Sequence, residues 1–230
     1  MKKRIGIQGF LMFTAIIAMI IFFKYLVPRH QGGILKLFLD TFGILLVACG
    51  FLLRIAARGY KSEHSANSQS LVSDGPYVLT RNPMYLGTFL IGVGISLLIF
   101  SWWVSLVFGF VFLLIYIPQI KKEEAILYRR FGEEYGRYRR ITPIFLPKPA
   151  GVFKKGIRKH IFLKWQWVNN EFHSLIGVVV LVIAIDLWKD IRFFGCLDYQ
   201  RESIKSLLVI LCFFIIALVF YEKEDVSKKF

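Results

Sequence analysis

Side chains that could do chemistry are concentrated at two places in the middle of the sequence. The first is the run Arg-Asn-Pro-Met-Tyr at residues 81–85, and the second is the pair Glu123 and Glu124. Residues 84–118 form a run of 35 positions without a charged side chain. If this run folds back on itself, both places lie at one membrane face and opposite charges line one pocket. Consecutive helical residues point about 100° apart, so one glutamate can face the pocket while the other pairs with a neighbouring lysine or arginine.

The length of the uncharged run predicts how it folds. As a single helix it would extend about 52 Å, whereas the hydrocarbon core of a bilayer is about 30 Å thick. We therefore expect a hairpin of two short membrane spans. Its turn is predicted near Ser101, Trp102 and Trp103, where the indoles would lie at the level of the lipid headgroups.

Composition places the rest of the chain in a membrane as well. Hydrophobic residues make up 56% of the sequence, aromatic residues 17%, and the mean hydropathy is +0.57. These values exceed what a soluble domain of 230 residues can bury. The predicted fold is an all-α polytopic membrane bundle of about six transmembrane helices, because four apolar runs add to the hairpin: residues 9–27, 34–53, 172–188 and 204–221.

The charge distribution predicts the orientation and the surroundings of the bundle. The formal net charge is +15, and most basic residues fall on the side of the membrane that also holds the N-terminus. Because cytoplasmic loops carry the excess of Lys and Arg, we expect both termini in the cytoplasm and the protein in a bacterial inner membrane. The basic residues flank spans, so we expect anionic lipid headgroups and not nucleic acid as their counterpart. No His, Cys or carboxylate cluster has metal-ligand spacing, so we expect no metal.

Three regions follow from this pattern. Residues 1–70 are the N-terminal two-span region, residues 71–149 hold the hairpin and a charged helix, and residues 150–230 are a basic connector with two further spans. A polar loop that includes His64, expected as a solvated surface residue, is predicted at residues 60–70.

The charged helix begins after Pro118 and has apolar residues at near-helical spacing, which predicts an amphipathic cytoplasmic helix. Gly132 and Gly136 weaken it from within, and the three prolines of residues 142–149 should end it. Small residues also recur along the first hairpin helix. These small residues are Gly87, Gly92, Gly94 and Ser96. They favour close helix packing, and the alternative is that a cofactor approaches the backbone at these positions.

Two motifs around the hairpin resemble a known family. The sequences are GPYVLTRNPMYLG at residues 75–87 and EEAILYRRFGEEYGRYRRITPIFLP at residues 123–147. They are similar to those of the phospholipid and isoprenylcysteine carboxyl methyltransferases, which are integral membrane enzymes that use S-adenosylmethionine. Asn82 stands where isoprenylcysteine methyltransferases usually have histidine, so the RNPMY run is closer to the phospholipid-methylating branch and to bacterial relatives.

The resemblance implies an S-adenosylmethionine site at the cytoplasmic side of this methyltransferase core. A glutamate can accept hydrogen bonds from the cofactor's ammonium or ribose hydroxyls, and Arg81 can hold its carboxylate. Tyr85 can offer a ring face to a cation or to adenine. Pro83 biases Asn82 away from helix, which would expose the backbone of Asn82 to a ligand. The cofactor-binding residues carried over are Arg81, Asn82, Pro83, Tyr85, Glu123 and Glu124.

The resemblance also implies the reaction and its substrate. The acceptor is expected to be a lipid, a lipid-modified protein of the isoprenylcysteine kind or another apolar molecule. Arg81 and Glu124 are the candidate catalytic residues, and Glu124 is a candidate base where an amine or a thiol must lose a proton. A carboxylate acceptor needs little acid or base help.

Two other functions compete with this prediction. A membrane reductase of the sterol-reductase-like type would use NADPH, but no phosphate-cradling glycine loop occurs in the sequence. A transporter would usually show mid-span charges or an inverted repeat, and the sequence has few such charges and no evident repeat.

Overall fold

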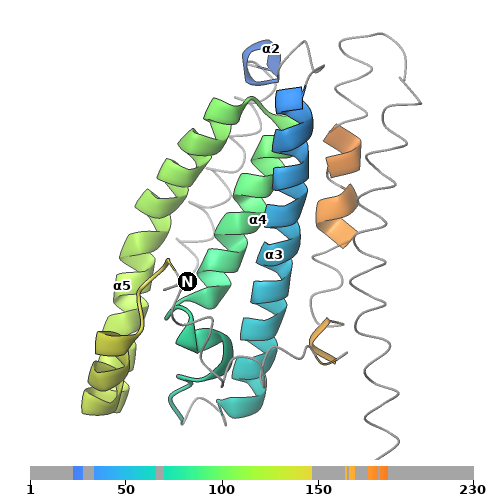
Figure 1. The fold of residues 1–230 in the computed structure, drawn as a ribbon. Coiled ribbons are helices and arrows are strands. Elements are labelled where there is room, and N and C mark those ends of the chain that lie inside the picture. Colours follow the sequence, from blue (N-terminus) through green and yellow to red (C-terminus); the bar gives the residue numbers. More distant parts are fainter. Residues whose placement is uncertain are drawn as a thin grey trace, which may run out of the picture.

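Three long helices lie side by side in the computed structural model of the chain (Figure 1). The structure describes residues 23–27, 34–65, 70–146, 164, 166–168, 176–180 and 182–185. These residues contain helices and no strand, which confirms the all-α prediction for the described part. The elements with labels are α2 (Phe23–Leu26), α3 (Ile34–His64), η2 (Gly75–Val78), α4 (Pro83–Ile99) and α5 (Trp102–Ile141).

Two of the helices are long and apolar enough to cross a membrane. They are α3 and α5. In the 18-residue apolar stretch of each helix, only 22% of the residues are buried inside the protein. Large apolar side chains therefore face outward along both helices, among them Phe38, Phe42, Leu106 and Phe110. Such a surface requires lipid around it, so the chain is a membrane protein. The runs 9–27 and 172–188 lie partly outside the described residues and the run 204–221 lies wholly outside them, so the count of six spans stays a prediction.

Two consecutive helices joined by a tight turn are present where the hairpin is predicted, while the crossing of the membrane by both of them stays a prediction. Helix α4 ends at Ile99 and α5 begins at Trp102, with Ser101 as the residue that precedes α5. Trp102 is 59% exposed at this turn. The Ser96 hydroxyl donates to the Ser105 hydroxyl at 2.9 Å and joins the two helices close to the turn.

Glycines explain how closely α3 and α4 approach each other. A methyl group added to Gly50 of α3 would lie 2.7 Å from the Gly87 carbonyl oxygen of α4, and one added to Gly94 would lie 2.6 Å from the Gly43 carbonyl oxygen. Gly92 faces the ring of Phe108 on α5. Close helix packing therefore accounts for these small residues, and the alternative of a cofactor at their backbone is wrong for the two that touch α3.

The predicted loop at residues 60–70 is wrong for its first part, because α3 continues to His64. The rings of Tyr60 and His64 stack at a centroid distance of 3.9 Å, as residues one helical turn apart can do. His64 itself is exposed, as expected.

A short segment from the C-terminal region packs against this end of α3. Trp167, in a helical turn at residues 166–168, is only 5% exposed, and Gly59 leaves the room for its ring. Its Nε1 donates to Glu63 Oε1 at 2.8 Å, while Lys164 Nζ lies 2.7 Å from Glu63 Oε2. The connector thus holds a specific contact with the core that the sequence analysis missed.

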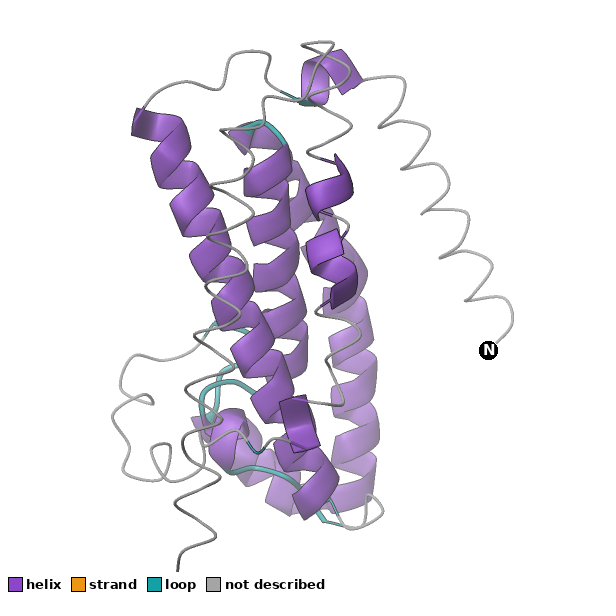
Figure 2. Cartoon of the chain, turned by 90° about the vertical axis from the view of Figure 1, so that its right-hand side faces the viewer, coloured by secondary structure: helices purple, strands orange, loops and turns teal. Residues whose placement is uncertain are grey.

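The charged segment predicted after Pro118 is the second half of α5, which continues through this proline without a break. The apolar first half, residues 102–118, is the part suited to the membrane. The helix is interrupted further on at Gly132, whose φ of 51° and ψ of −126° are not helical. It ends at Ile141, as the following prolines predict. Figure 2 shows most described loop residues at the lower end of the bundle, which is the end where α4 begins and α5 finishes.

Candidate functional site

The two polar places on either side of the hairpin meet at its lower end. Arg81 Nε lies 3.2 Å from Glu124 Oε1, and these side chains are only 9% and 8% exposed. The Tyr85 hydroxyl donates to Glu123 Oε1 at 2.7 Å. The structure therefore brings residues 81–85 and the glutamate pair together, as predicted.

The two glutamates have different partners. Glu124 is buried beside Arg81, whereas Glu123 accepts hydrogen bonds from Tyr85 and, at 2.6 Å, from Gln119 Nε2. Both carboxylates face the beginning of α4. The predicted alternative, in which one of them pairs with a neighbouring lysine or arginine, is not found in the described part of the chain.

The backbone before α4 is fixed by the chain that follows α5. The Arg81 N–H donates to the Pro143 carbonyl at 2.9 Å, and Asn82 Nδ2 donates to the Ile144 carbonyl at 2.9 Å. Pro83 occupies the first turn of α4, where its missing N–H costs nothing. These contacts hold the Arg81 side chain at the end of the hairpin.

The hydrogen bonds of the Asn82 backbone correct one detail of the prediction for this residue. Its N–H donates to Thr80 Oγ1 at 3.3 Å, and its carbonyl accepts from the Leu86 N–H at 3.1 Å. Pro83 does keep Asn82 out of the helix, but the backbone groups of Asn82 are taken within the chain and are not offered to a ligand.

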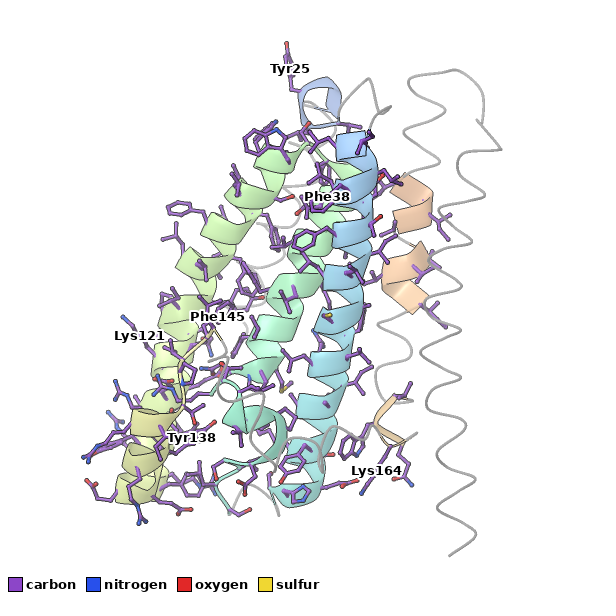
Figure 3. All side chains as sticks on the ribbon, in the orientation of Figure 1. Tyr25, Phe38, Lys121, Tyr138, Phe145 and Lys164 are labelled. Carbon is purple, nitrogen blue, oxygen red and sulfur yellow. The ribbon has the colours of Figure 1, made fainter. Side chains whose placement is uncertain are left out.

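A cavity of about 230 Å³ opens at this place. Its walls come from the end of α3, the segment before η2, the beginning of α4 and the charged half of α5. Figure 3 shows Tyr138 at the lower end of α5. All six predicted site residues line the cavity, together with residues that were not predicted to belong to the site: Lys61, Ser65, Ser70, Leu71, Val72, Tyr77, Met84, Leu127, Arg130, Phe131, Tyr135 and Tyr138.

Three tyrosines shape the cavity from α5 and η2. The Tyr138 hydroxyl donates to the Tyr77 carbonyl at 2.8 Å and ties the end of α5 to η2. Burial raises the pKa of Tyr77 far above its ordinary value. Burial, helped by the Glu124 carboxylate, also raises the pKa of Tyr135 to about 12, so both hydroxyls are protonated donors at neutral pH. The Phe-Gly-x-x-Tyr run that ends at Tyr135 was the sequence signal for this wall.

One buried donor in the cavity, Arg81 Nη1, has no hydrogen-bond acceptor among the described residues. An unsatisfied buried polar group costs about 1–3 kcal/mol, and more where the group is charged. A ligand that brings oxygen acceptors into the cavity would remove this cost.

Fold and cavity together define a helical membrane protein with a polar cavity at one end of a helical hairpin. The family model described as phospholipid methyltransferase matches residues 39–134. The chain belongs to this family of membrane methyltransferases, which includes the isoprenylcysteine methyltransferases. No solved structure matches.

Curated relatives cover the chain to different extents. The chain is 31% identical over 191 residues to the cobalt-zinc-cadmium resistance protein CzcN of Cupriavidus metallidurans. The aligned residues make up 82% of this chain and 84% of the relative. It is 35% identical over 77 residues to protein-S-isoprenylcysteine O-methyltransferase of Schizosaccharomyces pombe. This alignment covers 34% of this chain and 33% of that enzyme. With the mouse enzyme of the same name it shares 30% identity over 122 residues, which is 50% of this chain and 43% of the enzyme. The match to these two enzymes thus spans less than half of their length.

Proposed function

We propose that the chain is an S-adenosylmethionine-dependent methyltransferase that modifies a lipid, a lipid-modified protein or another apolar acceptor at the cytoplasmic membrane face. The observation that carries the proposal is the buried pair of Arg81 and Glu124, with Glu123 beside it, in a cavity at the end of the hairpin. Family membership makes methyl transfer the reaction to expect of this cavity.

The donors and acceptors of the cavity fit the cofactor. Arg81 Nη1 is buried and lacks an acceptor, which suits a carboxylate. Glu123 and Glu124 supply acceptors for an ammonium group and ribose hydroxyls. Tyr85 packs its ring against Tyr116 at a centroid distance of 5.5 Å, so its orientation is fixed and one face can stack on a ligand.

When bound, S-adenosylmethionine supplies an electrophilic methyl group on a sulfonium. Transfer of a methyl group is an in-line displacement, so the protein mainly has to align the acceptor and exclude water. The buried positions of Glu124 and Tyr135 (1% exposed) serve the exclusion of water. Glu124 is the carboxylate we assign as base for an amine or thiol acceptor, since it is the more buried of the pair.

The membrane supplies the acceptor. Most exposed apolar side chains of α3 and α5 belong to the parts of these helices that lie above the beginning of α4 in Figure 1, and residues at the beginning of α4 line the cavity. An amphiphile can therefore keep its tail in lipid while its headgroup reaches the cavity. The basic residues that follow Pro118 favour a cytoplasmic location for this end of the hairpin and, by alternation of the spans, for both termini.

Titration calorimetry of the detergent-purified full chain tests the proposal. S-adenosylhomocysteine should bind, and Glu123→Gln and Glu124→Gln should each weaken that binding about tenfold or more. Glu134→Gln is the matched control, because Glu134 is exposed on the same helix and does not line the cavity. Absence of S-adenosylhomocysteine binding to folded protein would overturn the proposal, and binding of NADPH instead would favour the reductase alternative.

A second measurement identifies the acceptor. Membranes that contain the protein are incubated with methyl-labelled cofactor, and the label is followed into fractionated lipids, lipid-modified peptides and small thiols. Label in an apolar fraction, lost in Glu124→Gln, is the expected result.

A further inference from the structure

Two exposed cations line the cavity and form no ion pair with a described residue. Lys61 comes from the end of α3 and Arg130 from the charged half of α5, and both are exposed residues that line the cavity. No ion pair joins either of them to a carboxylate within the described residues. Arg130 lies with Cζ 5.7 Å from the centroid of Phe131, another lining residue.

The acidic residues of the cavity are already occupied. Glu124 is paired with Arg81, and Glu123 accepts two hydrogen bonds. The lining residues therefore contribute three cationic and two anionic side chains, an excess of one positive charge. Lys61 and Arg130 are the exposed cations of this lining, whereas Arg81 is buried in its pair with Glu124.

Binding of the cofactor increases the positive excess. S-adenosylmethionine has a sulfonium, an ammonium and a carboxylate, so it adds one net positive charge to the cavity. A neutral or cationic acceptor would leave this excess uncompensated in a partly buried site, whereas an anionic group would offset it.

On the basis of the proposed function, we infer that Lys61 and Arg130 bind an anionic group of the acceptor, a phosphate or a carboxylate. They are specificity-determining residues that recognise the charged headgroup of an amphiphile. Arg130 on α5 provides the planar donor fork that suits such oxyanions, and Lys61 on α3 provides a point charge.

Binding of simple amphiphiles tests this inference. The probes are dodecyl phosphate, dodecanoate and dodecanol, titrated into the full chain in an uncharged detergent with saturating S-adenosylhomocysteine. We expect at least one of the two anions to bind tenfold or more tightly than dodecanol. The stronger of the two shows which oxyanion the site takes, and titration with inorganic phosphate shows whether the apolar tail is needed.

Charge-removing variants assign the effect to the two residues. Lys61→Gln and Arg130→Gln should each weaken binding of the preferred anion about fivefold and leave the affinity for S-adenosylhomocysteine within twofold. Arg129→Gln and Lys121→Gln are matched controls, because both residues are exposed on α5 and do not line the cavity. Equal binding of dodecanol, or equal losses in the controls, would overturn the inference.

The two proposals fail in different ways. If S-adenosylhomocysteine does not bind, the methyltransferase proposal is wrong. If it binds but neither anion depends on Lys61 and Arg130, the methyltransferase proposal stands and the headgroup site is wrong.

Discussion

Arg81 and Glu124 form a buried ion pair between the segment before α4 and the charged half of α5. Their closest atoms are 3.2 Å apart, yet Arg81 Nη1 has no hydrogen-bond acceptor in the described part of the chain. A buried charge pair is costly unless its remaining hydrogen-bonding capacity is also satisfied. The pair is therefore suited to a third, ligand-derived partner.

Removal of one member of this pair should be worse than removal of both. Arg81→Gln and Glu124→Gln each leave one buried charge unpaired, so we expect each to lower the stability of the protein by about 3 kcal/mol. The double variant should recover a large part of that loss. Thermal unfolding in detergent measures the effect, and strictly additive losses would contradict it. All three variants should still lose affinity for S-adenosylhomocysteine.

Tyr85 should contribute to ligand binding through Glu123. Tyr85→Phe removes the hydroxyl that donates to Glu123 Oε1 at 2.7 Å and frees that carboxylate to turn. We expect a three- to tenfold loss of affinity for S-adenosylhomocysteine, equivalent to about 1 kcal/mol. Tyr116→Phe is the control, because Tyr116 packs against the Tyr85 ring but does not line the cavity. An equal loss in both variants would contradict a specific role for the Tyr85 hydroxyl.

Gly132 should tolerate alanine less well than Gly136. Its φ of 51° lies in the left-handed region, where a side chain costs about 1–2 kcal/mol. Open space around Gly132 means that the cost comes from the backbone and not from a clash. Gly136→Ala, at a position with helical geometry, should be neutral or slightly stabilising. Thermal unfolding compares the two variants, and a larger loss at Gly136 would contradict the prediction.

The contact between the C-terminal region and α3 should stabilise the whole protein. Trp167→Ala empties a buried site and leaves Glu63 Oε1 without its donor, so we expect a loss of about 3 kcal/mol. Lys164→Gln should cost less than about 1 kcal/mol, because the Lys164 side chain is 59% exposed. Limited proteolysis between the core and the connector should be faster in Trp167→Ala, and unchanged proteolysis would mean that the contact does not hold the two regions together.

Local patterns were sufficient to predict the hairpin. An uncharged run too long for one span has few ways to fold, and the turn followed from its length and its tryptophans. The same geometry predicted that Arg81 and the glutamates lie together, because a hairpin returns its ends to one face.

Contacts between distant segments were not predictable in this way. Helical periodicity does not tell which glutamate pairs with Arg81, nor that the Asn82 amide donates to the Ile144 carbonyl. The continuation of α3 to His64 was also missed, because the ring stacking and the contact with Trp167 that accompany it depend on tertiary structure. Lys61 and Arg130 became visible only when the cavity was assembled.

The length of α4 connects this site to the thickness of the bilayer. With 17 residues, α4 rises only about 26 Å, which is less than the roughly 30 Å of an average hydrocarbon core. Lipid accommodates such hydrophobic mismatch by thinning locally. Because the cavity lies at one end of α4, a thinner bilayer would bring lipid headgroups closer to Arg81 and Glu124, and we expect membranes of shorter-chain lipids to favour the proposed methyl transfer.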